Sequence, residues 1–163
     1  MAHSSPQYSV PKGASFFRRF GAWLYDFLVL IAVEMLAIAL VVGAVAVAVQ
    51  LGFSIEGYTD VSDYLTRDPA ISPFFTIYVF AIAAGFYGYF WTQAGQTVGM
   101  RAWKLKVVSE FGGNITFTQA LIRMTTSCLG IGNLLALFDR NNRAFQDHFS
   151  NSQVIKIETV KTK

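Results

Sequence analysis

The chain has few charged residues and almost no cysteine, and both shortages limit the classes of protein to which it can belong. Only 14% of its 163 residues are charged, against roughly 25% in soluble domains, whereas 53% are hydrophobic. The single cysteine, Cys128, excludes an internal disulfide bond. Neither histidine has metal-ligand spacing, and no basic stripe with interleaved aromatic residues is present. We therefore expect an α-helical integral membrane protein, with no metal, no cofactor and no nucleic-acid partner.

The first long apolar block follows a tail at 1–15 that we expect to be flexible. It covers 21–49 and carries only two charged residues, Asp26 and Glu34. A helix needs about 20 residues to cross a bilayer, so the block is long enough. The apolar region of a cleaved signal peptide has only about 7–15 residues. We therefore expect the block to be a retained transmembrane helix.

The second apolar block covers 73–91 and predicts a second transmembrane helix. Aromatic residues crowd both of its ends, as they do where a spanning helix meets the two interfaces. Between them lie two pairs of small residues four positions apart, Ala81 with Gly85 and Ala84 with Gly88. Such pairs allow close approach of another helix, either in the same chain or in a second copy.

The distribution of charge predicts the topology. The loop at 51–72 is acidic, with four acids against Arg67, whereas the segments before the first block and after the second are basic. Cytoplasmic loops are enriched in lysine and arginine. We therefore expect the N-terminus to be cytoplasmic, the acidic loop to be external, and the two helices to be antiparallel.

The segment after the second helix has the pattern of strands. In the stretch 101–116, "RAWKLKVVSEFGGNIT", Leu105 and Val107 alternate with lysines, and a Gly-Gly pair supplies a tight turn. This predicts a cytoplasmic β-hairpin. Similar alternation near 152–158, within the C-terminal segment 139–163, predicts a further strand that pairs with the hairpin, because two strands alone are marginally stable.

A third apolar segment, 117–138, has two interpretations. Gly130 and Gly132 interrupt it, and Arg123 would be costly in a helix that faces lipid. We predict a broken, re-entrant or interfacial helical pair that keeps the C-terminus cytoplasmic. The alternative is a complete third span with an external C-terminus.

Three motifs together resemble one family. They are "RFGAWLYD" at 19–26, "GQTVGMRAWKLKVVSEFGGNITFTQALIR" at 95–123 and "FDRNNRAFQDHFSNSQVI" at 138–155. In this order they resemble the RDD family of small bacterial membrane proteins. The family is named for one arginine and two aspartates, which Arg19, Asp26 and Asp147 match.

The resemblance implies a helical protein of the bacterial inner membrane. Transport has been proposed for the family, and some members are described as cation/proton antiporters. The chain departs from the usual pattern at two places. Met100 and then Arg101 follow the Gly-x-Thr-x-Gly turn where a lysine is usual, and the order Asp147-His148 replaces His-Asp.

The charged residues near the first helix need partners from elsewhere in the chain. Arg19 and Asp26 share a helix face but lie about 10 Å apart along the axis, beyond ordinary pairing within a helix. An unpaired charge at the bilayer centre costs at least about 2.5–3.5 kcal/mol. We predict that Asp26 contacts Arg123 and that Arg19 contacts Asp147. The pairs could be structural clamps or part of an ion or proton site.

Glu34 is a separate candidate, read from this sequence alone. It lies about 12 Å deeper than Asp26, within the hydrocarbon, where a carboxyl group is rare and is a functional hypothesis by default. It could serve proton-coupled exchange of a monovalent cation. It could equally be a neutral acid that packs on the second helix and touches Thr76 or Tyr78.

Enzymatic activity is not expected, since no nucleophile motif surrounds His148 and "GQTVG" is too short for a phosphate loop. Two classes of function remain. One is a structural or accessory membrane protein, and the other is a cation/proton antiporter or another small-solute transporter. Two or three spans are few for a complete transport pathway, so we expect a homo-oligomer or a complex with another membrane protein.

Overall fold

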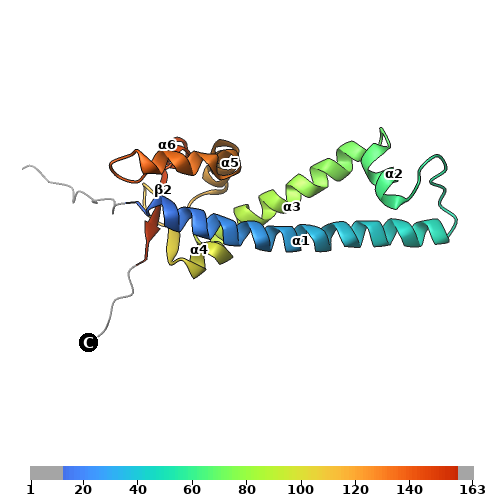
Figure 1. Cartoon of the computed structure of the whole chain (residues 1–163), viewed down its shortest axis with the longest axis horizontal. Helices are drawn as coiled ribbons and strands as arrows, with labels where there is room; N and C mark the ends of the chain where they lie inside the picture. Colours follow the sequence, from blue (N-terminus) through green and yellow to red (C-terminus); the bar gives the residue numbers. More distant parts are fainter. Residues whose placement is uncertain (1–12, 158–163) are drawn as a thin grey trace, which may run out of the picture. The chain divides into compact units, whose positions relative to one another are not determined.

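The computed structural model describes residues 13–157, including their side chains except at 128–130. The contacts divide the described chain into two compact units, one made of 13–26 with 88–157 and the other of Phe27–Tyr87. Figure 1 labels the elements along the chain. In order they are α1 (Phe16–Gln50), α2 (Val61–Arg67), α3 (Ser72–Gln93), α4 (Val98–Ala102), β1 (Leu105–Ser109), α5 (Phe117–Ser127), the 3-10 helix η1 (Cys128–Leu137), α6 (Phe145–Phe149) and β2 (Ser152–Lys156).

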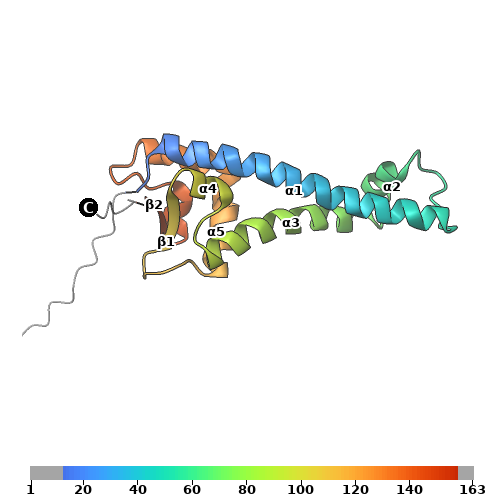
Figure 2. The same cartoon turned by 90° about the horizontal axis from the view of Figure 1, so that it is seen from below.

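The unit Phe27–Tyr87 consists mainly of two helices. After residue 26, α1 runs antiparallel to α3, and a loop that contains the short helix α2 joins them (Figures 1 and 2). Asp60 begins α2 because its side chain accepts the N–H of Asp63 at 2.8 Å. The hydroxyl of Tyr78 on α3 donates to the carbonyl of Ala37 on α1 at 3.0 Å, which ties the two helices together.

Both predicted membrane helices are present. α1 and α3 are long and apolar enough to cross a membrane, and only 6% of the most apolar 18-residue stretch of each helix is buried. Large apolar side chains such as Met35, Leu40 and Phe80 are exposed along them. A surface of this kind is stable only against lipid or another protein. The two helices therefore support the expected membrane class.

The other unit has a small core of its own. Strands β1 and β2 pair antiparallel, with Leu105 opposite Lys156 and Ser109 opposite Ser152. Leu105 and Val107 face inward, as their alternation predicts. In Figure 1, α5 and α6 lie on one side of the first turns of α1 and α4 on the other. The buried apolar residues of this core are Ala14, Ala22, Met100, Leu105, Val107, Ile115, Ala120 and Val154.

The predicted hairpin at 101–116 is wrong, although the predicted pairing with the C-terminal strand is right. A tight turn follows β1, where the N–H of Ser109 donates to the carbonyl of Gly113 at 3.1 Å. The chain then enters the core at Ile115 and does not return as a strand. β2 takes the place beside β1 because it pairs over five residues and adds Val154 to the core. Residue 158, the predicted end of that strand, lies outside the described residues.

The end of the predicted flexible tail is held by this sheet. Residues 1–12 lie outside the described part of the chain. Gly13 donates its N–H to the carbonyl of Asn141 at 3.0 Å, and Ala14 donates to the carbonyl of Val154 at 2.8 Å. Gly13 also forms an isolated antiparallel bridge with Ile155. The chain is therefore anchored immediately before α1 begins.

The third apolar segment is broken, as its glycines predict. α5 ends at Ser127, and the axis of the following stretch Ile131–Leu137 is turned by 87° from that of α5. Gly132 packs closely on the last turn of α5, since a Cβ there would lie 3.1 Å from the carbonyl oxygen of Thr126. The bend fits either a broken span or a re-entrant segment. Which of the two it forms stays a prediction.

Candidate functional site

Asp147 is the centre of a buried charge cluster that α6 positions. It is the third residue of α6, and its Oδ2 atom accepts the N–H of Ala144 at 3.0 Å, which fixes the start of the helix. The same Oδ2 accepts Nη2 of Arg19 at 2.7 Å, and Oδ1 accepts Nη1 of Arg123 at 2.8 Å. Each carboxylate oxygen therefore holds one arginine, and the side chain has no exposed surface.

Arg19 connects the first turn of α1 to the C-terminal segment. Besides the ion pair with Asp147, its Nε donates to the carbonyl of Ala14 at 2.9 Å. Its Nη2 also donates to the carbonyl of Asn142 at 2.9 Å and more distantly to that of Val154 at 3.4 Å. One guanidinium thus ties the entry to α1 to the loop before α6 and to β2. Long-range contacts of this kind explain why Arg19 is buried although it lies in the first turn of a helix.

Arg123 extends from α5 into the same cluster. Its Nη1 donates to the hydroxyl of Ser152 at 2.5 Å and reaches that of Ser150 at 3.5 Å. The indole ring of Trp91 lies 5.5 Å from the guanidinium carbon, within the range of a cation–π contact. The two serine hydroxyls are themselves 2.6 Å apart. Arg123 therefore joins α3, α5, α6 and β2 at one point.

The two arginines keep Asp147 ionised. Burial by itself raises the pKa of the Asp147 carboxyl, but the charges of Arg123 and Arg19 and the hydrogen bonds from Arg19 and Ala144 outweigh it. The net effect is a pKa below its usual value. The cluster alone carries one excess positive charge. Over the described residues, however, the buried ionisable side chains are two arginines and two aspartates, the second being Asp26.

Asp26 is bound separately, by the start of α4. Its Oδ2 accepts the hydroxyl of Thr97 at 2.5 Å, and its Oδ1 accepts the N–H of Gly99 at 2.7 Å. Thr97 is the N-cap of α4, and its hydroxyl in turn accepts the N–H of Met100 at 3.3 Å. The carboxylate therefore satisfies donors at the beginning of a helix that would otherwise be buried without partners.

Glycine is required at position 99 because α4 lies directly on α1. A Cβ there would overlap the carbonyl oxygen of Ala22 and would lie 2.9 Å from Cγ of Asp26. No side chain fits without moving the backbone of α1 or α4. Gly99 thus allows the close approach that brings its own N–H within reach of Asp26. Since α4 leads into β1, this contact also positions the sheet.

One predicted contact is confirmed and the other is wrong. Arg19 pairs with Asp147, as predicted. Arg123 does not pair with Asp26, because α5 places it beside α6 and β2, where Asp147 and Ser152 receive its donors. Asp26 is instead satisfied by neutral donors of α4. The structure therefore brings Arg19, Arg123 and Asp147 into one cluster, and it gives Asp26 a site of its own.

Glu34 belongs to the unit Phe27–Tyr87. It is half-buried, and its Oε2 atom is buried with no hydrogen-bond partner among the described residues. Among the described residues, neither Thr76 nor Tyr78 forms a hydrogen bond with Glu34, and both hydroxyls donate to carbonyls of the helices. Thr76 donates to Ser72 at 2.8 Å, and Tyr78 donates to Ala37 at 3.0 Å. Glu34 thus remains a carboxyl group in a candidate span without an assigned partner.

Sequence reasoning missed the residues that complete both sites. Thr97 and Gly99 lie in the "GQTVG" stretch, which is part of the family resemblance and is excluded as a phosphate loop, but from which no contact to Asp26 was predicted. The motif carries a usable signal, because a threonine followed by a glycine fits the N-cap and first turn of a helix packed tightly on a neighbour. Ser150, Ser152 and Trp91 carried no comparable signal, since only the fold brings them to Arg123.

Comparison with known families agrees with the motifs. The model of the RDD family matches residues 13–151, a range that includes Arg19, Arg123 and Asp147 of the charge cluster and also the Asp26 site. Neither the curated proteins nor the solved structures compared with the chain gave a significant match. Because the family model matches most of the chain, the protein belongs to the RDD family.

Proposed function

We propose that the protein is a structural or accessory component of the bacterial inner membrane that works as a homo-oligomer or bound to another membrane protein. Family membership and two long apolar helices support the membrane part of this proposal. The charge distribution supports a cytoplasmic N-terminus and an external loop at 51–72.

The observation that carries the proposal is how Arg19, Asp26 and Asp147, the three residues for which the family is named, are bonded in the fold. Arg19 and Asp147 pair with each other, and Arg123 takes the remaining oxygen of Asp147. Asp26 has a donor on each of its oxygens. A group that carries an ion or a proton must exchange partners during its cycle. Here every oxygen of both carboxylates accepts a donor that also holds the fold together, which favours a structural role.

The need for a partner follows from the two candidate spans. They expose most of their apolar surface, and two helices cannot by themselves enclose a polar pathway. Light scattering of the protein purified in mild detergent and in nanodiscs tests this. We expect a species of at least twice 18.0 kDa, or a co-purifying membrane protein in stoichiometric amount. A monomer without a partner in both media would contradict the proposal.

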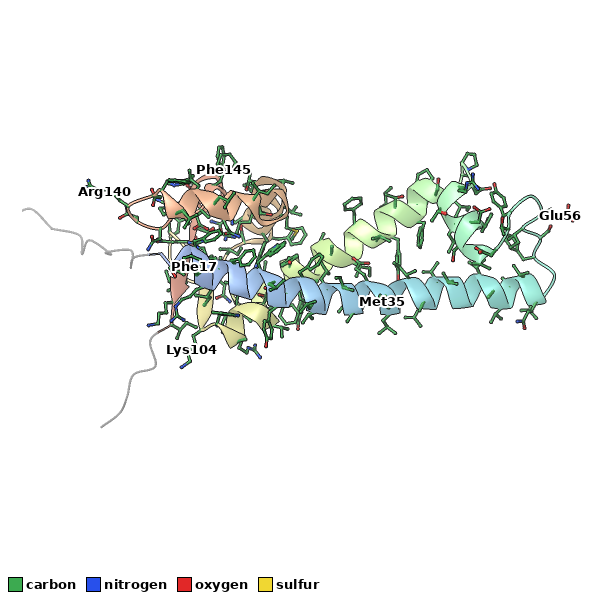
Figure 3. All side chains as sticks on the ribbon, viewed as in Figure 1. Phe17, Met35, Glu56, Lys104, Arg140 and Phe145 are labelled. Atoms are coloured by element: carbon green, nitrogen blue, oxygen red, sulfur yellow. The ribbon has the colours of Figure 1, made fainter. Side chains whose placement is uncertain are left out.

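Glu34 supports one alternative, a cation/proton antiporter or other small-solute transporter. Its buried, unpartnered oxygen in a candidate span is the kind of group that proton-coupled exchange requires. If the alternative holds, Glu34→Gln abolishes cation-driven proton movement in vesicles and leaves the amount of protein unchanged. Glu56→Gln is the matched control, since Glu56 is an exposed acid of the loop (Figure 3). Equal flux in wild type and Glu34→Gln would remove Glu34 from the mechanism.

A further inference from the structure

The segment from α5 to α6 has an inverted polarity. Arg123, Gln146 and Asp147 are buried, whereas nine large apolar side chains of the segment are exposed. Phe138 is the extreme case, with 84% of its surface exposed. A surface helix in water has the opposite arrangement, with charge outside and apolar groups inside. The outward residues, called here the phenylalanine face, are Phe117, Leu121, Ile131, Leu134, Leu135, Leu137, Phe138, Phe145 and Phe149.

Two rings of the phenylalanine face lie on α6 and contact each other. The rings of Phe145 and Phe149 contact each other with centroids 4.6 Å apart, yet both remain exposed. Figure 3 shows Phe145 extending away from α6 into the surroundings. The exposed rings are therefore held in place by α6, whose inward side is fixed by the Asp147 cluster. Nine exposed large apolar side chains within one short segment indicate an apolar partner.

Two threonine hydroxyls of α5 donate to carbonyls of their own helix. Thr125, which is exposed, donates to the carbonyls of Leu121 at 3.1 Å and Ile122 at 3.0 Å. Thr126 donates to the carbonyl of Ile122 at 2.5 Å. The candidate span α3 uses the same arrangement at Thr76. Hydrocarbon offers no hydrogen-bond partner, so polar groups that face it must be satisfied within their own helix.

From these observations we propose that the phenylalanine face is a lipid-binding surface, which lies among the acyl chains of one leaflet with Arg140 at the level of the anionic headgroups. Continuity with the bilayer supports lipid as the occupant, since the unit contains one end of each candidate span, 16–26 of α1 and 88–93 of α3. Charge supports it as well. Arg140 is exposed only two residues after Phe138, where a phosphate could accept its donors.

Spin labels on single cysteines in the full-length protein test this proposal. The background is Cys128→Ala, and the labelled positions are Phe138→Cys and Phe145→Cys in vesicles of phosphatidylethanolamine and phosphatidylglycerol. Power saturation compares collisions with oxygen, which partitions into the bilayer, and with a water-soluble nickel chelate. Met35→Cys is the control for lipid, because Met35 is exposed on a candidate span, and Glu56→Cys is the control for water (Figure 3).

The proposal predicts that the labels at 138 and 145 shift toward oxygen as far as the Met35 label does. Nickel accessibility equal to that of the Glu56 label would overturn it, and the proposed membrane role would still stand if the Met35 label remained in lipid. Loss of both collision signals, with dipolar broadening between copies, would also overturn it, because a second copy would then cover the face. If either cysteine prevents folding, Leu134→Cys and Phe149→Cys replace them.

Discussion

Replacing Asp147 by asparagine should destabilise the protein more than replacing either of its arginine partners. The change keeps the size of the side chain but removes the negative charge that both arginines share. Arg19 and Arg123 would then be buried with no carboxylate within hydrogen-bond distance. Arg123→Gln is milder, because Asp147 keeps its ion pair with Arg19.

The magnitude follows from the burial of the cluster. Removing one partner of a buried ion pair costs about 3–5 kcal/mol, and Asp147→Asn should lie in that range because all three side chains are at most 3% exposed. Arg123→Gln should cost roughly half as much, since one of the two pairs survives. In the double variant the costs should not add. We expect a coupling free energy of about 1–3 kcal/mol, because Arg123 no longer needs compensation once it is replaced.

Unfolding in mixed micelles with increasing sodium dodecyl sulfate measures these free energies. Tryptophan fluorescence is a suitable signal, because Trp91 lies against Arg123 and Trp103 packs on Gly21. The matched control is Glu110→Gln, which breaks a partly exposed ion pair with Arg143. Pairs of that kind contribute about 0–1 kcal/mol. Additive losses in the double variant, or a loss for Asp147→Asn no larger than for Glu110→Gln, would refute the reasoning.

Three further predictions concern the Asp26 site, pH and topology. Gly99→Ala should lower the free energy of unfolding by about 1–3 kcal/mol, because the added Cβ forces α4 away from α1. Gly85→Ala is the control and should not destabilise, since a Cβ there meets nothing within 4 Å. Equal unfolding curves for the two variants would contradict the close packing at Gly99. Folding lowers the pKa of Asp147, so the ionised carboxylate contributes to the free energy of unfolding above its unfolded pKa of about 4, and this contribution is lost as the pH falls through the folded pKa. The free energy of unfolding should therefore fall more steeply with acid in wild type than in Asp147→Asn. Parallel curves for the two proteins would argue against this. A cysteine introduced at Lys161 in a Cys128→Ala background should resist an impermeant reagent in intact cells, and rapid labelling from outside would exclude a cytoplasmic C-terminus.

The sequence was sufficient for the elements that depend on composition along the chain. The two apolar blocks predict α1 and α3 because a helix satisfies its backbone internally and needs only length and apolarity to enter a membrane. The break in the third segment follows from its glycines, and the inward face of β1 follows from alternation. These features are local, so no knowledge of the fold is needed to predict them.

Partner choice could not be predicted in the same way. Charge compensation predicts that Asp26 pairs with Arg123, yet the carboxylate accepts a hydroxyl and an amide from the start of α4. Charge compensation alone does not distinguish a cation from well-placed neutral donors. The predicted hairpin is wrong for a related reason. The Gly-Gly turn predicts that β1 pairs with the residues that follow it, but β1 pairs instead with β2, which lies far along the chain and provides five paired residues. Both errors are choices between competing partners that only the packed fold decides.

The central claim is that Arg19, Asp26 and Asp147 hold the fold and do not carry ions. The most direct test measures proton movement driven by a sodium or potassium gradient in vesicles that contain purified wild-type protein or Asp26→Asn, with unfolding curves from the same preparations. The account predicts that wild-type flux equals that of protein-free vesicles and that Asp26→Asn lowers the free energy of unfolding. Protein-dependent flux in wild type that disappears in Asp26→Asn, at unchanged stability, would contradict it.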